Sequence, residues 1–532
     1  MTLKPTSFSS WEPTNMGGGQ LSPEDYPQYQ GRGTEFPLGD SSRGQEPFTA
    51  INWQQEIGPD SWSTVSTLDN PPVPMRSQSS EANSSTLTFS RFSDDQETCI
   101  FAKLLIPGRG KPISDAAVGI SQAEGKITFV GKQSDLPKRL QAARQICVGY
   151  LLPGLWDCHT HFAGALNVDF PDFIQTHPAN LGAAITRGFH DTLMAGFTSV
   201  RDVGSYATEV APLMERGIIL GPNVFGAGAA IGITGGSCDC NPLPLDYVYS
   251  RQGTNDARQD PWSGVSQLVL ADGVDNCRLA VRQQIRRGAR CIKIVATGGV
   301  LSTTDDPKYR QYSDSELHAM VEEATLQGRS VAIHAHGKDG IMAAIRAGAH
   351  TIEHGSYIDE EAADLMAARG VTLVATRNVI EAGLRHLDTL NPPTARKMVQ
   401  VAEMHKKAYA TAVKKNVKIA LGTDIAGSDP SSQTSHGKNG PELVWAVQAG
   451  LTPLQAIEAA TINAAETLGK LRPNKGLIME GWDADMIAVE HNPLEEIKEL
   501  ADAANIKFVW QGGLLVKSPN SRMLWPPPRT VK

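Results

Sequence analysis

The sequence between residues 150 and 469 alternates short apolar, β-rich runs with helical patterns, and this alternation limits the possible folds most strongly. Helix signals between the runs include the capping box of Ser313 and Glu316 and the closing Gly328. Eight strands alternating with helices over about 320 residues is typical of a parallel (β/α)8 TIM barrel. A doubly wound open sheet is the alternative. The eight runs are 150–156, 197–201, 223–227, 291–296, 330–333, 350–352, 371–375 and 417–421.

Short strand patterns also occur on both sides of this region. Strands at the two ends can pair with each other, so we expect one small composite β-sandwich domain into which the barrel is inserted. Three patterns precede the barrel and three follow it, namely 98–106, 116–120, 126–131, 485–489, 506–510 and 514–516. The expected boundaries are 95–149 and 471–532 for the two halves of the β domain and 150–470 for the barrel.

The first 94 residues differ from the rest of the chain. About 53 of the first 90 are Ser, Thr, Pro, Gly, Asn or Gln, a composition too polar to bury a core. All thirteen histidines lie later, between His159 and His491. We therefore expect residues 1–94 to be a disordered extension; a docking or targeting segment that folds on a partner is the alternative.

Composition and charge argue against several classes of protein. Lys and Arg number 49 against 57 Asp and Glu, and the net charge of −8 disfavours a nucleic acid or an anionic membrane as partner. No run of about 18 apolar residues is present, and residues 1–10 lack the apolar core of a secretory signal. Seven scattered cysteines suit a reducing compartment, and the spacing of Cys238 and Cys240 is unusual for zinc. We therefore expect a cytoplasmic protein.

Unusual polar residues stand at or near the ends of the predicted strands, where α/β barrels build their active sites. Because side chains alternate along a strand, the two histidines of each His-x-His pair point the same way. Neutral imidazoles and one carboxylate that converge at a barrel mouth suit a borderline cation such as zinc. A hydrogen-bonded histidine pair and a helix-capping aspartate are the alternatives. These residues are His159, His161, Lys293, His334, His336, His354 and Asp424.

Lys293 lies among apolar residues of the fourth run. Burying an unpaired ammonium costs several kcal/mol, so a buried ion pair with Glu353 or Asp424 is one interpretation. The other interpretation is a lysine that captures carbon dioxide. The resulting carbamate has the geometry of a carboxylate and can bridge two metal ions.

The stretch Pro153-Gly154-Leu155-Trp156-Asp157-Cys158-His159-Thr160-His161 begins a resemblance to the metal-dependent amidohydrolase superfamily that covers residues 96–520. The chain resembles the imidazolonepropionase- and prolidase-like branch of that superfamily, and within it a fungal amidase of carboxypeptidase type. Further matching stretches are 271–274, 284–289, 297–300, 336–338, 340–345 and 420–424.

The resemblance implies a site with two divalent metal ions, for which the imidazole-rich set favours zinc. It implies that His159, His161 and Asp424 bind the first metal and that His334 and His354 bind the second. Carboxylated Lys293 bridges both, which requires carbon dioxide. A water between the metals attacks an amide carbonyl, and Asp424 acts as general base and then as general acid.

Two substrate-binding residues are open to two interpretations each. His336 holds a position that contacts the substrate carboxylate in relatives, or else it orients His334. Ser237 stands where relatives carry a histidine in a Thr-x-Gly-His-Gly segment. A serine is shorter and never cationic, and a lost oxyanion donor costs on the order of 10²–10³ in rate. The protein therefore positions its substrate differently or has low activity.

The expected function is hydrolysis of an amide bond to a C-terminal amino acid, in N-acyl amino acids and hydrophobic dipeptides. Arg377 is a second candidate for the substrate carboxylate; its alternative is a surface pair with Glu381. The long loop 231–270 is expected to cover the site and to favour a bulky apolar group through Tyr247, Tyr249 and Trp262. Hydrolysis of a cyclic amide or imidazolone and a weakly active or non-catalytic barrel are the alternatives. We expect a homo-oligomer.

Overall fold

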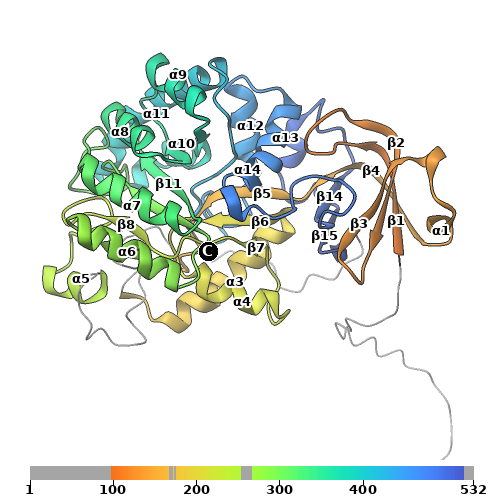
Figure 1. Ribbon diagram of the computed structural model, residues 1–532, viewed down its shortest axis with the longest axis horizontal. Coiled ribbons are helices and arrows are strands. Elements are labelled where there is room, and N and C mark those ends of the chain that lie inside the picture. Colours follow the sequence, from red (N-terminus) through yellow and green to blue (C-terminus); the bar gives the residue numbers. More distant parts are fainter. Residues whose placement is uncertain (1–96, 167–171, 173–174, 253–266, 520–532) are drawn as a thin grey trace, which may run out of the picture. The chain divides into compact units, whose positions relative to one another are not determined.

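The computed structural model describes residues 97–166, 172, 175–252 and 267–519 (Figure 1). The predictions for residues 1–94 and for Trp262 therefore lie outside the described residues. A mixed sheet forms one end of the described chain, and alternating strands and helices form the remainder (Figure 1). None of the described helices combines the length and the apolarity that crossing a membrane requires.

Seven strands form one mixed sheet that contains both flanks of the described chain. Strand β1 lies between β4, which runs parallel to it, and β2, which runs antiparallel. Strand β14 pairs with β4, with Ile487 opposite Leu152, so segments far apart in sequence are neighbours. The expected sandwich is thus a single hydrogen-bonded sheet in the order β16-β15-β14-β4-β1-β2-β3. The bounds are β1 Glu97–Leu105, β2 Ile113–Ser121, β3 Lys126–Lys132, β4 Arg144–Pro153, β14 Met486–Val489, β15 Phe508–Gln511 and β16 Leu514–Lys517.

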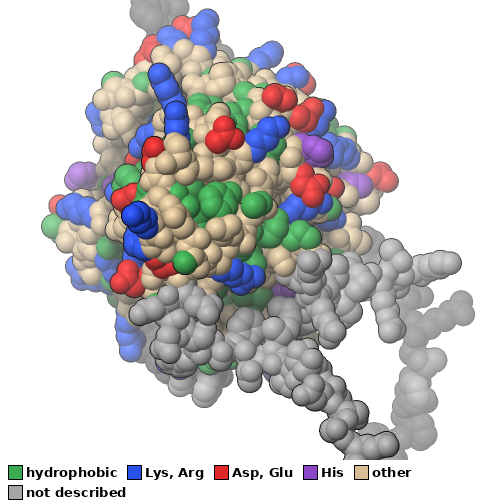
Figure 2. Space-filling model, turned by 90° about the vertical axis from the view of Figure 1, so that its right-hand side faces the viewer, with side chains coloured by type: hydrophobic (Ala, Val, Ile, Leu, Met, Phe, Trp, Pro, Cys, Tyr) green, Lys and Arg blue, Asp and Glu red, His purple; other side chains and the backbone are tan. Residues whose placement is uncertain are grey.

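This sheet has its own apolar core, which includes Ile100, Val118 and Trp510, none more than 1% exposed. A short helix, α1 (Lys138–Gln141), adds Leu140 at zero exposure. Figure 2 views this end of the molecule. Apolar side chains gather near the centre of the face, and positive and negative side chains are interspersed around them.

The first predicted strand of the barrel is divided between two sheets. Residues 150–153 belong to β4 of the mixed sheet, and a separate strand, β5 (Leu155–Thr160), begins after Gly154. The N–H of Gly154 donates to the carbonyl of Asp485, and a Cβ at this position would lie 2.0 Å from Oγ1 of Thr198. A glycine therefore allows the chain to pass closely from one sheet to the other. Residues 144–149 also form part of β4, which the sequence pattern did not predict.

Parallel strands follow one another through the middle of the chain. One sheet has the order β5-β6-β7, and a second has the order β13-β12-β11-β10-β8-β9. The predicted run 417–421 forms no regular strand, but Ile419 bridges Leu373 and Ile425 bridges Thr160, both in parallel. The three-residue strands β8 and β9 were not predicted. The bounds are β6 Phe197–Asp202, β7 Asn223–Val224, β8 Ala230–Gly232, β9 Leu268–Leu270, β10 Cys291–Val295, β11 Ser330–Ala335, β12 Thr351–His354 and β13 Thr372–Val374.

Helices alternate with these strands and cover their outer faces (Figure 1). The capping box of Ser313 and Glu316 is confirmed at the start of α7, and α8 and α9 end at Gly348 and Gly370 in the left-handed conformation. The bounds are α3 Pro178–Met194, α4 Ala207–Glu215, α5 Leu245–Gln252, α6 Val274–Arg286, α7 Asp314–Leu326, α8 Lys338–Ala347, α9 Glu360–Arg369, α10 Arg377–Arg385, α11 Pro392–Lys414, α12 Pro441–Gln448, α13 Pro453–Ala459 and α14 Ile462–Glu466.

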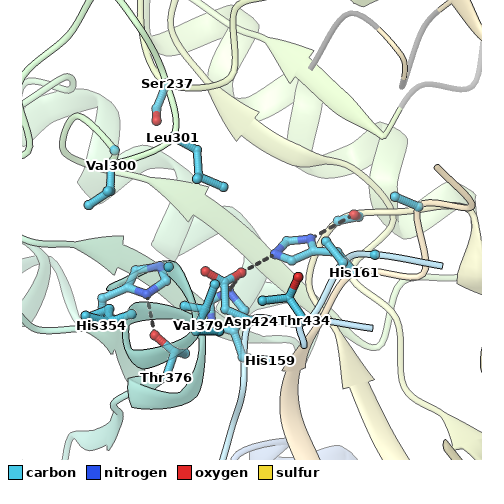
Figure 3. A pocket seen from close by; sticks show the side chains of 18 of the residues that line it. His159, His161, Ser237, Val300, Leu301, His354, Thr376, Val379, Asp424 and Thr434 are labelled. Atoms are coloured by element: carbon cyan, nitrogen blue, oxygen red, sulfur yellow. Dashed lines mark hydrogen bonds and ion pairs between the residues drawn. The ribbon is translucent and has the colours of Figure 1, made fainter. Parts of the chain in front are cut away.

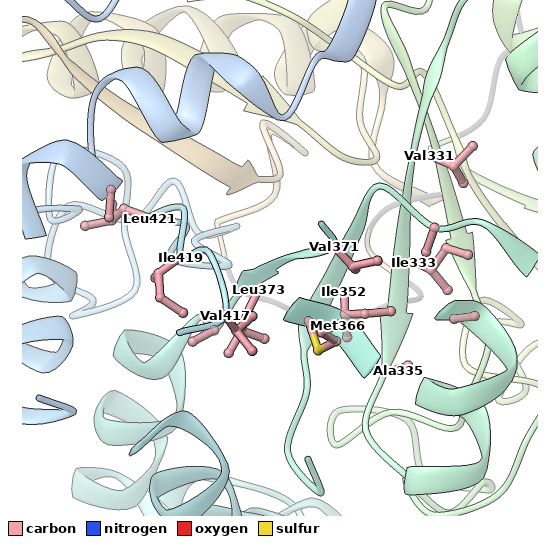
Figure 4. Close-up of a cluster of buried hydrophobic side chains, with 14 of the residues drawn as sticks. Val331, Ile333, Ala335, Ile352, Met366, Val371, Leu373, Val417, Ile419 and Leu421 are labelled. Atoms are coloured by element: carbon pink, nitrogen blue, oxygen red, sulfur yellow. The ribbon is translucent and has the colours of Figure 1, made fainter. Parts of the chain in front are cut away.

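The main core lies between these strands and helices (Figure 4). On β11, Val331 and Ile333 are fully buried in this core together with Ile352 of β12 and Leu373 of β13. Because side chains alternate along a strand, His334 points to the opposite face of β11 from Ile333. The apolar residues that anchor the strand to the helices thereby direct the histidine away from them, toward the candidate site.

Candidate metal centre

The candidate ligands come together in two groups near the carboxyl ends of the parallel strands (Figure 3). His159, His161 and Asp424 form one group, and His334, His336 and His354 form the other. Within each group the ligand atoms all lie within 4.8 Å of one another. The elements that carry the candidates are β5 for His159, the residue after β5 for His161, β10 for Lys293, β11 for His334, the residue after β11 for His336, β12 for His354 and the turn after the 417–421 segment for Asp424.

The first group is arranged around Asp424, whose Oδ1 lies 3.2 Å from Nε2 of His161 and 3.4 Å from Nε2 of His159. Nδ1 of His159 lies 2.7 Å from Oε2 of Glu353, and Nδ1 of His161 lies 3.0 Å from the carbonyl oxygen of Gly204. Carboxylate and carbonyl oxygens accept hydrogen bonds, so Nδ1 of each ring carries a proton. In the neutral form of each ring Nε2 keeps a lone pair that faces the carboxylate, although Asp424 outweighs burial and raises the pKa of His161.

In the second group a neighbouring oxygen also fixes each ring. Nε2 of His334 lies 3.2 Å from the carbonyl oxygen of Gly298, which leaves Nδ1 of that ring with the lone pair. Nδ1 of His354 lies 2.7 Å from Oγ1 of Thr376. The centres of these two rings are 4.5 Å apart. His334 and His354 therefore present ring nitrogens to a common space.

Lys293 lies next to the first group, with Nζ 3.3 Å from Nε2 of His159 and a residue exposure of 2%. Burial lowers the pKa of its ammonium, although the charges of Glu353 and Asp424 oppose that shift. Within the described residues, Lys293 comes within ion-pair distance of neither carboxylate. The ion-pair interpretation thus has no direct contact to support it, and a neutral amine is the form that reacts with carbon dioxide.

The electrostatics of the site suit a bound cation. Burial, reinforced by the charge of Lys293, lowers the pKa of His159 and of His334 to about 4. Burial alone would raise the pKa of Asp424, but His159 and His161 outweigh it and hold that pKa at about 2. Neutral imidazoles and an ionised carboxylate are the forms that bind zinc. The residues present therefore fit a divalent metal.

Glu353 and Arg201 support this centre, and their partnership was not predicted. Glu353 is fully buried, and its Oε1 accepts a 2.8 Å bond from Nη2 of Arg201 while Oε2 faces His159. Nε of Arg201 donates to the carbonyl of Cys158 at 2.7 Å. The sequence pattern left Glu353 as a possible ion-pair partner for Lys293. In the structure Glu353 pairs with Arg201 instead. The available signal was Arg201 itself, a charge within the apolar 197–201 run.

Three residues at the centre have left-handed backbones that are uncommon outside glycine. The φ angles are 68° at His354, 56° at Thr376 and 61° at Asp424. Each such conformation costs about 1–3 kcal/mol and persists only when its surroundings impose it. At Asp424 that constraint comes from Asp157, whose carboxylate accepts from the N–H and the hydroxyl of the preceding residue, Thr423. Asp157 is therefore a further supporting residue that the sequence did not identify.

A cavity of roughly 610 Å³ opens beside the candidate ligands. His336 and Ser237 line it, and Nδ1 of His336 lies 2.7 Å from Oγ of Ser356. One part of the lining is apolar and comes from Val300, Leu301, Val379, Ile380, Leu390 and Met398, which we call the apolar wall. Another part carries hydroxyl and amide groups from Gln267, Ser431, Ser432, Gln433 and Thr434.

Three further candidates do not line this cavity. Arg377 is buried, and its guanidinium donates to Glu381 at 2.6 and 2.9 Å and to the carbonyl of Ala402 at 2.6 Å. The pair with Glu381 is thus the one observed, although it is not on the surface. Tyr247 and Tyr249 lie on α5 and do not contribute to the described lining. The hydroxyl of Tyr249 contacts Oγ1 of Thr234 at 2.8 Å instead.

The parallel α/β fold and this centre define the chain as a hydrolase of a recognisable class. Residues 150–516 match the family model described as the amidohydrolase family. The chain belongs to that family and is a hydrolase that acts on amide bonds. The prediction of this family from the sequence is confirmed.

Similar proteins include the fungal amidase that the sequence resembles. Ochratoxinase from Aspergillus niger is 45% identical over 428 residues, which cover 79% of this chain and 87% of that protein. Its crystal structure covers 80% of this chain and 97% of its own, with a TM-score of 0.75. A Xaa-Pro dipeptidase structure with bound methionine is 31% identical, has a TM-score of 0.68 and covers 80% of this chain and all of its own. Imidazolonepropionase from Idiomarina loihiensis is 25% identical, covering 76% of this chain and 92% of that protein.

Proposed function

We propose that this chain is a two-metal amidohydrolase that releases the C-terminal amino acid from N-acyl amino acids, ochratoxin-like ones included, and from hydrophobic dipeptides. The observation that carries this proposal is the position of the two ligand groups, which face one cavity with an apolar wall. The similarity to ochratoxinase and to a Xaa-Pro dipeptidase supports it, since both names denote enzymes that cleave amide bonds.

We also propose that the parallel strands are arcs of one closed (β/α)8 barrel. Strands β7 and β8 lie on one segment of chain, and β7 pairs with β6 while β8 pairs with β10. The bridges of Ile419 and Ile425 connect β13 through the 417–425 segment to β5. Apart from β9, which pairs only with β8, these pairings follow the order of the chain, whereas a doubly wound sheet reverses its strand order.

In the proposed site His159, His161 and Asp424 would hold one metal, and His334 and His354 would hold the other. Zinc suits four imidazoles and a carboxylate. Lys293, after carboxylation of its amine, would supply the bridging oxygens, and its burial and lowered pKa support that reaction. When bound, such metals lower the pKa of a water molecule and polarise an amide carbonyl.

Asp424 carries the proton transfers in this proposal. Its carboxylate is ionised, with a pKa of about 2, and the ionised form is the one that can accept a proton from the attacking water, although so low a pKa makes it a weak base. The protonated carboxyl group then donates to the leaving nitrogen of the amide. The left-handed backbone at Asp424, which Asp157 constrains through Thr423, keeps Oδ1 directed toward the two histidines.

The cavity supports a substrate with a free carboxylate and a bulky apolar group. Burial lowers the pKa of His336 well below its usual value, so a neutral ring would donate one hydrogen bond to the carboxylate while Ser356 fixes its other nitrogen. The apolar wall would bind the hydrophobic part. Ser237 lines the same cavity and would donate to the developing oxyanion in place of the histidine of relatives.

A substrate screen with zinc-loaded protein tests this function. We expect release of phenylalanine from N-acyl-phenylalanines, with turnover that follows metal content after chelation and reloading. The second candidate function is hydrolysis of a cyclic amide or imidazolone, which the similarity to imidazolonepropionase favours. Hydrolysis of the cyclic substrate without release of amino acids from acyclic ones would reverse the assignment, and a metal content below one per chain would support a non-catalytic barrel.

A further inference from the structure

A nearly buried ammonium joins two of the segments that form the apolar wall. Lys397 lies on α11 with a side-chain exposure of 13%. Its Nζ donates to the carbonyl of Gly299 at 3.0 Å, to the carbonyl of Ser302 at 2.8 Å and to Oδ1 of Asp305 at 3.0 Å. All three acceptors belong to the loop of residues 298–305, which follows β10. The three protons of the ammonium therefore all find acceptors on this loop.

Both joined segments contribute to the cavity. Val300 and Leu301 come from the 298–305 loop, and Met398 follows Lys397 directly on α11. Val300 packs against an apolar cluster that contains Met398, and Oγ1 of Thr394, also on α11, donates to the carbonyl of Leu301 at 3.3 Å. Figure 3 shows Val300 and Leu301 drawn above His354 and Asp424, on the other side of the open space.

The carboxylate that pairs with Lys397 extends the connection to Ser237. Asp305 accepts a 2.8 Å hydrogen bond from Nε2 of Gln311 and a 3.2 Å bond from the N–H of Gly299. Oε1 of Gln311 in turn accepts from the N–H of Ser237 at 3.3 Å. The loop, helix α11 and the segment that carries Ser237 are thus linked through one buried ion pair.

A buried ion pair gains little stability, because the desolvation of two charges offsets their attraction. What it supplies is a fixed geometry, since several directed hydrogen bonds hold the loop in one register. Apolar contacts alone, such as those between Val300 and Met398, are not directional and allow the loop to slide. The ion pair is thus suited to keeping the width of the cavity constant.

We propose that Lys397 is a positioning residue that fixes the apolar wall and thereby sets the preference for a bulky apolar group. This inference rests on the proposed function of the same cavity. Lys397 is not part of the lining, so it acts through Val300, Leu301 and Met398. Loosening the wall removes contacts with a large apolar group, while a small group makes few such contacts to lose.

The test compares Lys397→Met with Lys475→Met in the full-length, zinc-loaded protein. Lys475 is a matched control, because its side chain is 12% exposed, pairs with Asp483 and Asp485 just before β14 of the mixed sheet, and does not line the cavity. Kinetics are measured on N-naphthoyl-phenylalanine and on N-acetyl-alanine. In Lys397→Met we expect KM for the bulky substrate to rise about tenfold with kcat within about twofold, and little change for the small substrate. Lys475→Met keeps the wild-type preference.

Three results would overturn the inference: an unchanged preference in Lys397→Met, an equal loss of preference in both variants, or an equal fall of kcat on both substrates with loss of metal. The last would mean that the ammonium acts on the metal centre through Gly298 and His334. If Lys397→Met does not fold, Thr394→Val is tested in its place. It removes only the hydrogen bond from Thr394 to the carbonyl of Leu301 and should shift the preference for the bulky substrate in the same direction. No shift in that variant would also contradict the inference.

Amide hydrogen exchange provides a readout that does not depend on turnover. Residues 298–305 should exchange faster in Lys397→Met than in Lys475→Met or the wild type. The acceptors of the loop then lose the ammonium that holds them, so the loop opens more often. If the wild type cleaves no amide substrate, the proposed function fails while faster exchange still supports the positioning role. Unchanged exchange refutes the positioning role whatever the substrate proves to be.

Discussion

The fully buried Glu353 shows how single residues prepare this centre. One oxygen of its carboxylate faces Nδ1 of His159, and the other accepts from Arg201, which is itself fully buried. The hydrogen bond to Nδ1 selects the tautomer in which Nε2 is free to bind a metal. Arg201 keeps the carboxylate ionised, and the pKa of Glu353 is held well below its usual value. The proposed metal ligand His159 thus depends on two charged side chains, Glu353 and Arg201, that are not themselves candidate ligands.

Glu353→Gln should weaken metal binding while preserving the shape of the side chain. An amide has no net charge and its NH₂ group cannot accept, so the tautomer of His159 is no longer fixed. We expect metal affinity to fall about 10–100-fold, measured by competition with a chelator. The control is Glu323→Gln, which neutralises a buried carboxylate of α7 that pairs with Arg282 of α6. Equal metal affinity in Glu353→Gln and the wild type would contradict the supporting role.

Lys293→Ala should lose the proposed bridge and with it most of the bound metal. About two zinc ions per chain are expected in the wild type, counted by elemental analysis of dialysed protein. Lys293→Glu places a carboxylate near the same position and should restore part of the metal content. Lys475→Ala is the control, because it removes a nearly buried lysine that does not line the cavity. Retention of both metals and of the full rate in Lys293→Ala would exclude the bridge.

The residues that could be predicted from the sequence are those whose type is unusual for their place. Histidines at strand ends and Lys293 in an apolar run are such cases, and the structure brings them together. Their supporting groups could not be predicted, because the carbonyl oxygens of Gly204 and Gly298 have no sequence signature. Arg377 was undecided between two partners. Its guanidinium pairs within the protein, one helical turn away, with Glu381.

At the scale of elements, long apolar runs were predictable and short or shared ones were not. Strands β10 and β11 coincide closely with their predicted runs, since apolar side chains on both faces are typical of buried parallel strands. Strands β8 and β9 have three residues each, too few to show a period. The run 150–156 is continuous in sequence but serves two sheets, which only the close packing at Gly154 reveals.

Gly154→Ala should destabilise the fold at the junction of β4 and β5. The added Cβ would lie 2.0 Å from Oγ1 of Thr198, so either this junction or Thr198 of β6 must shift, at a cost of about 1–3 kcal/mol. Chemical denaturation measures the free energy of unfolding. Thr198→Ala in the same chain should recover part of the loss. Gly182→Ala in α3 is the control, because nothing lies within 4 Å of its Cβ, and a stability loss as large there would contradict the steric account.

At the scale of the whole molecule, the mixed sheet and the parallel strands form one connected unit. Strand β14 returns to pair with β4, and the N–H of Gly154 donates to the carbonyl of Asp485 at 2.9 Å. Arg109, in the turn after β1, pairs with Glu458 of α13 and with Glu466 of α14 at 2.5 and 2.9 Å. The mixed sheet is therefore tied to helices α13 and α14 through Arg109.

Removal of residues 1–94 should leave both folding and activity unchanged. The hydrogen-bonded sheet begins at Glu97, and every candidate ligand lies at His159 or later. Limited proteolysis followed by activity and melting measurements checks this expectation. A trimmed protein that aggregates or loses activity would show that the extension contributes to the fold or to an assembly.

The central claim is that the enzyme cleaves an amide next to a free carboxylate, and substrate amidation tests it most directly. The measurement compares kcat/KM for an N-acyl-phenylalanine and for its C-terminal amide. A hydrogen bond from His336 to a charged carboxylate is worth about 1.5–3 kcal/mol, so we expect the free acid to react roughly 10–150 times faster. In His336→Ala this ratio should fall toward one. Equal rates on acid and amide in the wild type would contradict the account and favour hydrolysis of a cyclic amide.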